Sequence, residues 1–314
     1  MSDWRSEFQT AFPNLDCKRD FPLQQLTYFK IGGPAELLVL IKTLTELQKV
    51  VAYLKQHKLK FVILGGASNV VVADEGIQGV VLQLQNQTFE VKANTVLVGA
   101  GLKTSLLVKQ TVAAGLTGLE VFLGVPGTVG GAVLNNAHYL SKLIAEYIVR
   151  VQVVTLSGET FWLSKAEADF GYDYSRFQTS GEIIWQVEFQ LPLGEIDKSK
   201  EQIRMATEYR AKTQPLGLAS SGCIFQNVPN TAQLRELLPQ FAEKDLVPGG
   251  FLIDQAGLKG LRVGDLEVSQ KHAAFIVNHG QGTAEQLRQL IDQVKAAVKT
   301  KFGVELHEEV FYLR

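Results

Sequence analysis

The chain has 314 residues, of which 46% are hydrophobic and 20% charged, an ordinary globular composition with core material for two or three domains. A net charge of −1 without any basic run excludes the pattern typical of nucleic-acid-binding proteins, and no apolar run approaches the ~18 residues of a membrane span. Cys17 and Cys223 lack the spacing of a disulfide framework or zinc site. Together, these observations predict a cytoplasmic protein that binds no metal, nucleic acid or membrane.

The first third of the chain alternates strands with a helix. The helix is predicted over about residues 44–56, where apolar residues recur on one face and Thr43 and Glu46 form a capping box. A turn of small residues, 65–69, follows an apolar segment. Strands are predicted over residues 35–41, 60–64 and 79–84.

The middle third has the rhythm of short antiparallel strands. "FEVKA" and "TVLVGAG" read as strands, and a helix is predicted over about 104–114, where Gly115 would end it. The segment "YIVRVQVVTLSGETFWL" predicts a hairpin that turns at Ser157 and Gly158, followed by a strand over 183–191. These patterns favour an α+β protein.

The last third begins after the polar segment 194–202, which reads as a domain boundary. "HAAFIVN" has the composition of a strand. A long helix is predicted to start at a capping box formed by Thr283 and Gln286. Its apolar face carries Leu287, Leu290, Ile291, Val294 and Val298. The segment "GVELHEEVFYL" reads as a short strand that closes the chain.

Three glycine-rich turns stand out, at residues 28–35, 64–76 and 123–133. Small residues allow backbone N–H groups to approach an anion closely, although a single glycine turn usually only permits a loop. Three of them favour a long ligand such as a dinucleotide. None matches G-x-G-x-x-G at the start of a helix, so a Rossmann site is not expected.

In their order along the chain, several segments resemble the MurB family of UDP-N-acetylenolpyruvoylglucosamine reductases, which are flavoenzymes. The resemblance covers roughly residues 25–312, and "VPGTVGGAV" together with "SSGCIFQN" is its most specific part. The other matching segments are "YFKIGGPA", "LGGASNVVVADEGIQGVVL", "FGYDYSRF", "YRAKTQPLG", "IDQAGLKGLRVGDLEVSQKHAAFIVN" and "LHEEV".

The resemblance implies an α+β fold with a two-subdomain FAD-binding region of the vanillyl-alcohol-oxidase-like (PCMH) type and a C-terminal α+β substrate-binding domain. We expect the subdomains at residues 1–84 and 85–195, and the UDP-sugar domain at 204–314 with its last strand returning Glu309 to the active site. The implied reaction is the NADPH-dependent reduction of UDP-N-acetylglucosamine enolpyruvate to UDP-N-acetylmuramate, by a monomer or weak oligomer.

The resemblance also implies non-covalent FAD, with its pyrophosphate near the first of two glycine-rich segments. The expected FAD contacts are Gly65, Gly66, Ala67, Ser68, Asn69, Gly124, Pro126, Gly127, Thr128, Gly130, Gly131 and Asn136. For the UDP-sugar, the expected contacts are Tyr172, Arg210, Gln214, Asn227, Lys259 and His272.

Reduction of an enol ether conjugated to a carboxylate needs groups that stabilise the developing enolate and an acid that protonates carbon. From local sequence alone, Cys223 reads as a buried structural cysteine and Glu309 as a solvated strand carboxylate. The resemblance instead implies that Cys223 donates the proton and that Glu309 assists at the enolate.

Three positions depart from the family pattern. Asp173 stands where an arginine is usual, so Arg176, three residues later, is the candidate for the missing cation. "NNAHYL" is shortened by about one residue, and its His138 either contacts flavin or caps a loop. Gln226 replaces a common lysine or arginine. Another FAD-dependent oxidoreductase on the same scaffold, or a non-catalytic homologue that binds flavin or a nucleotide sugar, is therefore kept as an alternative.

Overall fold

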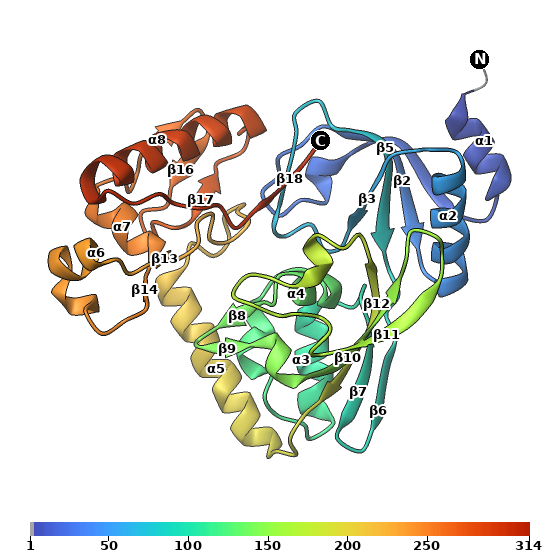
Figure 1. Ribbon diagram of the computed structural model, residues 1–314, viewed down its shortest axis with the longest axis horizontal. Helices are drawn as coiled ribbons and strands as arrows, with labels where there is room; N and C mark the ends of the chain where they lie inside the picture. The colour runs from blue at the N-terminus through green and yellow to red at the C-terminus, as the bar shows by residue number, and fades with distance from the viewer. Residues whose placement is uncertain (1–2) are drawn as a thin grey trace. The chain divides into compact units, whose positions relative to one another are not determined.

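The computed structural model describes residues 3–314, and their contacts divide the chain into two compact units (Figure 1). The N-terminal unit contains the chain through Phe21, then Ala35–Gly66 and Ile77–Tyr209. The C-terminal unit contains Pro22–Pro34, Ala67–Gly76 and Arg210–Arg314. Each unit has its own hydrophobic core.

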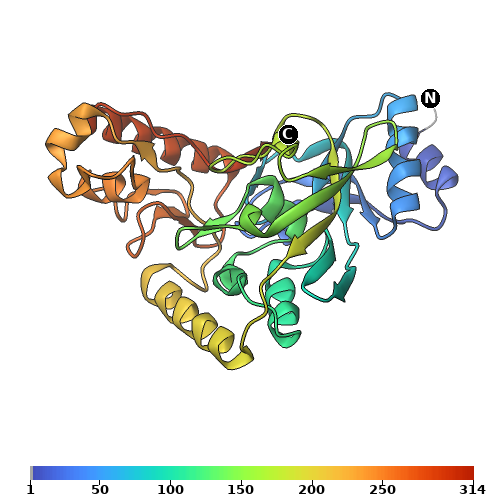
Figure 2. The ribbon, with the colours of Figure 1, turned by 60° about the horizontal axis from the view of Figure 1, so that its bottom comes forward.

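A partly parallel sheet forms the first layer of the N-terminal unit. Its strand order is β1 (Asp16–Pro22), β2 (Pro34–Ile41), β5 (Ile77–Leu84) and β3 (Phe61–Leu64). Both β2 and β3 pair parallel to β5. The connection from β2 to β3 is α2 (Leu44–Gln56), which lies along this sheet (Figures 1 and 2) and buries its apolar face in the core.

The second sheet of this unit is antiparallel throughout. The hairpin turn before its edge strand uses Gly158 at φ +85°, a conformation that favours glycine. Both sheets contribute to one hydrophobic core. The strand order is β11 (Thr160–Ser164), β10 (Ile148–Val154), β12 (Ile183–Gln190), β7 (Thr95–Gly99) and β6 (Phe89–Lys92), and the helices of the unit are α1 (Trp4–Ala11), α3 (Thr104–Ala113) and α4 (Val129–Leu134).

The C-terminal unit is built around α8 (Ala284–Phe302), whose apolar face is buried against small strand pairs. The last strand, β18 (Phe311–Leu313), pairs parallel to β4 (Val70–Val72). The unit's other elements are α6 (Ala232–Leu237), α7 (Gly249–Gln255), the pair β13 (Val228–Pro229) and β14 (Leu246–Val247), and the sheet of β15 (Arg262–Val263), β16 (Leu266–Val268) and β17 (Ile276–Asn278).

Most predicted elements are confirmed within one or two residues, including both capping boxes. The polar segment 194–202 is different, because most of it forms the first half of α5 (Ile196–Thr213). This helix has few buried residues and is rich in ion pairs such as those of Arg204 with Glu201 and Glu208. It therefore lacks the apolar stripe that would have revealed a helix. The closing strand, β18, is also shorter than predicted: it contains only Phe311–Leu313, so Glu309 precedes the last strand and is not part of it.

The two-unit division differs in detail from the three-part division expected from the sequence. Residues 22–34 and 67–76 group with the C-terminal unit because Phe29, Ile31 and Val71 pack in its core. The split into two FAD-binding subdomains remains a prediction. Within residues 3–314, no helix combines the length and the apolar character needed to cross a membrane.

Candidate active site

The first glycine turn meets the second within the N-terminal unit. A Cβ on Gly66 would lie 2.4 Å from Cα of Gly127, and one on Gly65 would lie 2.6 Å from Oγ1 of Thr128. The Gly66 distance is far below van der Waals contact between carbon atoms, so this approach of two backbones requires glycine, whereas a Cβ on Gly65 would meet only the Thr128 side chain this closely. Oγ1 of Thr128 is buried and has no hydrogen-bond partner among residues 3–314, which is the kind of orphaned donor that a bound ligand satisfies. The turns therefore fit a phosphate-bearing cofactor.

The remaining predicted FAD residues of the second turn lie on and around α4. Gly130 donates its N–H to the Ala100 carbonyl at 2.9 Å, and a Cβ there would meet Cβ of Ala100 at 2.9 Å, so this glycine also serves helix–strand packing. A Cβ on Gly131 would be 3.8 Å from its nearest neighbour. Gly124 ends a 3-10 turn, η2 (Glu120–Gly124), two residues before Pro126.

The end of the first turn, Ala67 to Asn69, belongs to the C-terminal unit. Ala67 has φ +52°, and its carbonyl accepts a hydrogen bond from the Tyr28 N–H at 3.1 Å. Ser68 lies between Ala67 and Asn69 in the chain. Nδ2 of Asn69 donates to the carbonyl of Glu309 at 3.0 Å. A predicted FAD residue and a predicted catalytic residue are thus in direct contact.

Cys223 begins an extended segment that lies between two others in the C-terminal unit. On one side, Ile224 N–H donates to the Ala274 carbonyl at 2.8 Å. On the other, Glu309 N–H donates to the Ile224 carbonyl at 2.8 Å. Gly222 precedes Cys223 at φ +88°, so the turn requires glycine for its conformation. Cys223 is half-buried and forms no disulfide. The two predicted catalytic residues therefore lie on neighbouring, hydrogen-bonded segments.

Buried polar atoms flank this segment. Oγ of Ser220, Oγ of Ser221 and Nδ1 of His272 are buried without a hydrogen-bond partner in the described part of the chain. Burial lowers the pKa of His272, and the nearby charge of Lys259 lowers it further, so the imidazole is neutral near pH 7. Buried polar groups are rarely left unpaired. These three atoms indicate a polar ligand site beside Cys223.

Of the predicted substrate residues, only Tyr172 lies in the N-terminal unit, and the other five lie in the C-terminal unit. Lys259 forms an ion pair with Asp254 at 2.6 Å. Asn227 accepts the N–H of Gly249 through Oδ1 at 3.4 Å. Arg210 is in the last turn of α5 and Gln214 directly follows that helix. Sequence reasoning missed Ser220 and Ser221, although both were in the quoted segment "SSGCIFQN".

The loop after Phe170 holds one departure from the family pattern, Asp173, and contacts a second, His138. Nδ1 of His138 lies 3.1 Å from Oδ1 of Asp173, and the His138 ring packs on that of Tyr172 with centroids 5.0 Å apart. Nδ2 of Asn136 donates to the Gly171 carbonyl at 2.7 Å, so this predicted FAD residue fixes the loop. The sequence showed both departures but gave no sign that His138 and Asp173 meet.

Arg176, the candidate replacement cation, is engaged within the N-terminal unit. Its guanidinium donates to the carboxylate of Glu182 at 2.9 Å and to the carbonyl of Glu167 at 3.1 Å. Contact with a substrate carboxylate would therefore compete with an existing ion pair. A catalytic role for Arg176 remains a prediction.

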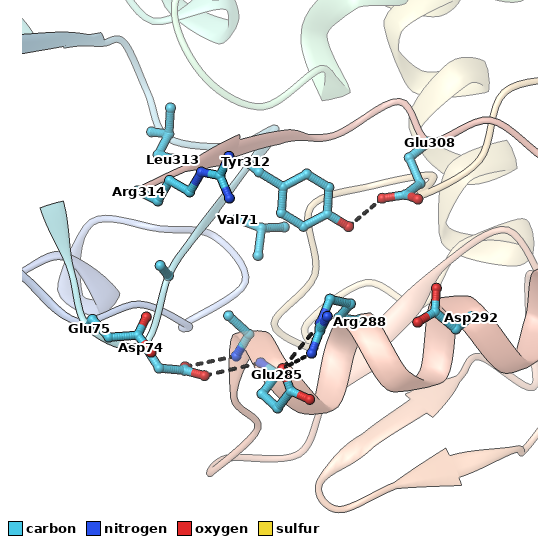
Figure 3. Close-up of a pocket in the computed structure, with 12 residues that line it drawn as sticks. Val71, Asp74, Glu75, Glu285, Arg288, Asp292, Glu308, Tyr312, Leu313 and Arg314 are labelled. Carbon is cyan, nitrogen blue, oxygen red and sulfur yellow. Dashed lines mark hydrogen bonds and ion pairs between the residues drawn. The ribbon is translucent and has the colours of Figure 1, made fainter.

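A cavity of about 610 Å³ lies beside Glu308 in the C-terminal unit (Figure 3). The Glu308 carboxylate is bound by Lys295 and by the hydroxyl of Tyr312, and burial together with that carboxylate raises the pKa of Tyr312. Asp74 accepts N–H groups from the first turn of α8. Glu308 therefore has structural partners, and a catalytic role for the next residue, Glu309, remains a prediction.

Comparisons with known proteins agree with this arrangement. A model described as UDP-N-acetylenolpyruvoylglucosamine reductase, C-terminal domain, matches residues 214–313, and an FAD binding domain model matches residues 35–164. The expected α+β fold, with an FAD-binding region followed by a separate C-terminal domain, is thereby confirmed.

Individual relatives match over nearly the whole chain. UDP-N-acetylenolpyruvoylglucosamine reductase 1 of Bacillus anthracis is 36% identical over 93% of this chain and 92% of its own length. The Streptococcus thermophilus reductase is 36% identical over 97% and 95%. The crystal structure of the Thermus caldophilus reductase covers 96% of this chain and 99% of its own, with 32% identity and a TM-score of 0.77. The chain therefore belongs to the UDP-N-acetylenolpyruvoylglucosamine reductase family, FAD-dependent oxidoreductases of peptidoglycan synthesis.

Proposed function

We propose that the protein reduces UDP-N-acetylglucosamine enolpyruvate to UDP-N-acetylmuramate with NADPH as the electron source. The observation that carries this proposal is the hydrogen bond from Glu309 N–H to the Ile224 carbonyl at 2.8 Å, because it holds Glu309 beside the segment that begins at Cys223. The reaction is assigned to the cytoplasm, where thiols stay reduced.

FAD would be held by Gly65, Gly66 and the Thr128 hydroxyl, whose geometry fits a close anionic ligand. When bound, it supplies the hydride-transfer chemistry that links NADPH to the enolpyruvyl double bond. The protein side chains then have two tasks, which are to stabilise negative charge at the enolpyruvyl carboxylate and to deliver one proton to carbon.

Cys223 is the proposed proton donor. A thiol with an ordinary pKa of ~8.5 is mostly protonated at pH 7 and is far more acidic than a serine hydroxyl. Its S–H bond breaks as a C–H bond forms, and the thiolate is reprotonated from solvent. Glu309 would assist in its protonated form, since an ionised carboxylate is only an acceptor and would repel the enolate.

The UDP-sugar would bind in the C-terminal unit. Lys259 offers a cation for a diphosphate, and it lies near enough to His272 to affect the pKa of that imidazole. Ser220 and Ser221 add buried hydroxyls without partners in residues 3–314. Together these groups provide the mixture of charge and hydrogen-bond capacity that a nucleotide sugar needs.

The test uses purified protein reconstituted with FAD. NADPH oxidation is followed with and without UDP-N-acetylglucosamine enolpyruvate, and the product is identified by mass spectrometry. We expect oxidation that depends on the enolpyruvyl compound and yields UDP-N-acetylmuramate. Oxidation that ignores this compound and consumes oxygen would favour a different flavoenzyme, and flavin binding without turnover would favour a non-catalytic protein.

A further inference from the structure

Asn69 contacts the chain on both sides of Val310. Its Nδ2 atom donates to the Glu309 carbonyl at 3.0 Å, and its own carbonyl accepts the N–H of Phe311 at 3.1 Å. The parallel pairing of β4 with β18 starts at the next residue, where Val70 lies opposite Phe311. Both segments belong to the C-terminal unit. One residue of the first glycine turn therefore holds the end of the chain directly after Glu309.

A second extended segment holds the opposite side of Glu309. The Glu309 N–H donates to the Ile224 carbonyl at 2.8 Å, and a neighbouring bond joins the Gln226 N–H to the His307 carbonyl at 2.9 Å. Each residue has one backbone donor and one backbone acceptor, and those of Glu309 are held by different neighbours. The bond to Ile224 is made by backbone atoms alone, whereas the bond to the Glu309 carbonyl depends on the Asn69 side chain.

The residue before Glu309 is anchored on its own face. The Glu308 carboxylate is bound by Lys295 and by the hydroxyl of Tyr312, beside the cavity (Figure 3). Successive residues of an extended segment point to opposite faces, so Glu309 is directed away from this cavity. Loss of the Asn69 bond would release the peptide unit that follows Glu309, and the Glu309 side chain would lose part of its fixed direction.

We propose, on the basis of the function above, that Asn69 is a positioning residue for Glu309. The Asn69 amide holds the Glu309 carbonyl and thereby keeps the Glu309 carboxyl group in place to assist at the enolate. Asn69 itself does not touch the reacting atoms. This role goes beyond the FAD contact expected for Asn69, and the two roles differ kinetically. A residue that only binds FAD affects both halves of the reaction, whereas Glu309 acts only when the enolpyruvyl group is reduced.

The two half-reactions are measured separately by anaerobic stopped flow at saturating FAD. In the first, NADPH reduces the bound FAD. In the second, UDP-N-acetylglucosamine enolpyruvate reoxidises it. We expect Asn69→Ala to slow the second half-reaction about 10- to 100-fold, as when a reacting group is misplaced by about 1 Å. The rate of FAD reduction by NADPH should be unchanged.

Two further variants test whether Asn69 acts through its N–H donor and through Glu309. Asn69→Asp keeps the shape of the side chain but replaces the donor with an acceptor, so the second half-reaction should slow at least as much as in Asn69→Ala. A side chain that only fills space would tolerate this change. In a Glu309→Ala protein, adding Asn69→Ala should cause no further loss, because both changes act through the same side chain.

The matched control is Asn230→Ala. Nδ2 of Asn230 donates to the carbonyls of Phe241 and Lys244, each at 2.8 Å, so this asparagine also ties backbone segments of the C-terminal unit together. Its loss should lower the Tm and leave the second half-reaction unchanged. Thermal unfolding of each variant verifies that rates are measured on folded protein.

The outcomes separate this proposal from the proposed function. Reduced wild-type flavin that the enolpyruvyl compound does not reoxidise would overturn the proposed function, and the role of Asn69 with it. Normal wild-type reoxidation with an equally fast second half-reaction in Asn69→Ala would overturn the role of Asn69 alone. Equal slowing of both half-reactions would assign Asn69 to FAD binding only. Slowing of the same size in Asn230→Ala would assign the effect to general destabilisation and also overturn the proposal.

Discussion

Replacing Gly66 with alanine tests the close contact of the two glycine turns. The added Cβ would lie 2.4 Å from Cα and 2.8 Å from the carbonyl carbon of Gly127. Carbon atoms pack at about 3.5–4.0 Å, so one backbone must move by about 1 Å. The obstacle is backbone, which cannot rotate away as a side chain can. Overpacking of this kind costs about 1–3 kcal/mol.

The assay is thermal unfolding of the FAD-free protein, followed by titration with FAD. A loss of about 1–3 kcal/mol corresponds to a Tm lower by about 2–12 °C in a chain of this size class, and FAD affinity should also fall. Gly131→Ala is the control for FAD-free stability, because its Cβ would be 3.8 Å from the nearest atom. If the Gly66→Ala protein has the same Tm and the same FAD affinity as the wild type, the close contact between Gly66 and Gly127 would be refuted.

Two further predictions concern buried or capping carboxylates. Burial acts to raise the pKa of Glu120, but hydrogen bonds from Ser199 and Thr117 hold this pKa below its ordinary value of 4.5. The ionised carboxylate therefore stabilises the folded protein above that pH, and this stabilisation is lost as the pH falls through the lower pKa of the folded state. Glu120→Gln should cost about 2 kcal/mol at pH 7 in denaturant unfolding, and a difference that does not shrink at acid pH would contradict this. Asp74→Ala should cost about 1 kcal/mol, since Asp74 accepts the Ala284 and Glu285 N–H groups; Asp292→Ala is the control, and equal losses would be inconsistent with capping.

Local sequence patterns were sufficient to predict those helices and strands that have a capping motif or a periodic apolar face. The capping box of Thr43 and Glu46 and the apolar face that follows it locate α2. In α5 the charges pair along the helix, as in Arg204 with Glu208, so the apolar period is absent. The periodicity of apolar residues indicates which face of a helix is buried, so a helix with little buried surface cannot be predicted from it.

The candidate site was harder to predict from the sequence, because its contacts join residues that are far apart in the chain. The resemblance supplied Cys223 and Glu309 as candidates, but the bond between Glu309 and Ile224 depends on strand pairing that no local pattern encodes. The contact between His138 and Asp173 is of the same kind. Both residues were noticed as departures, and only the fold shows that the two departures meet.

The most direct test of the central claim, that Cys223 protonates the substrate carbon, is a single-turnover measurement. FAD bound to the protein is reduced with NADPH under anaerobic conditions, UDP-N-acetylglucosamine enolpyruvate is added, and flavin absorbance is followed by stopped flow. Wild type and Cys223→Ser should reoxidise the flavin, whereas Cys223→Ala should be slower by about 10²–10⁴-fold, the usual contribution of a positioned acid. Reoxidation of Cys223→Ala at the wild-type rate would contradict the account.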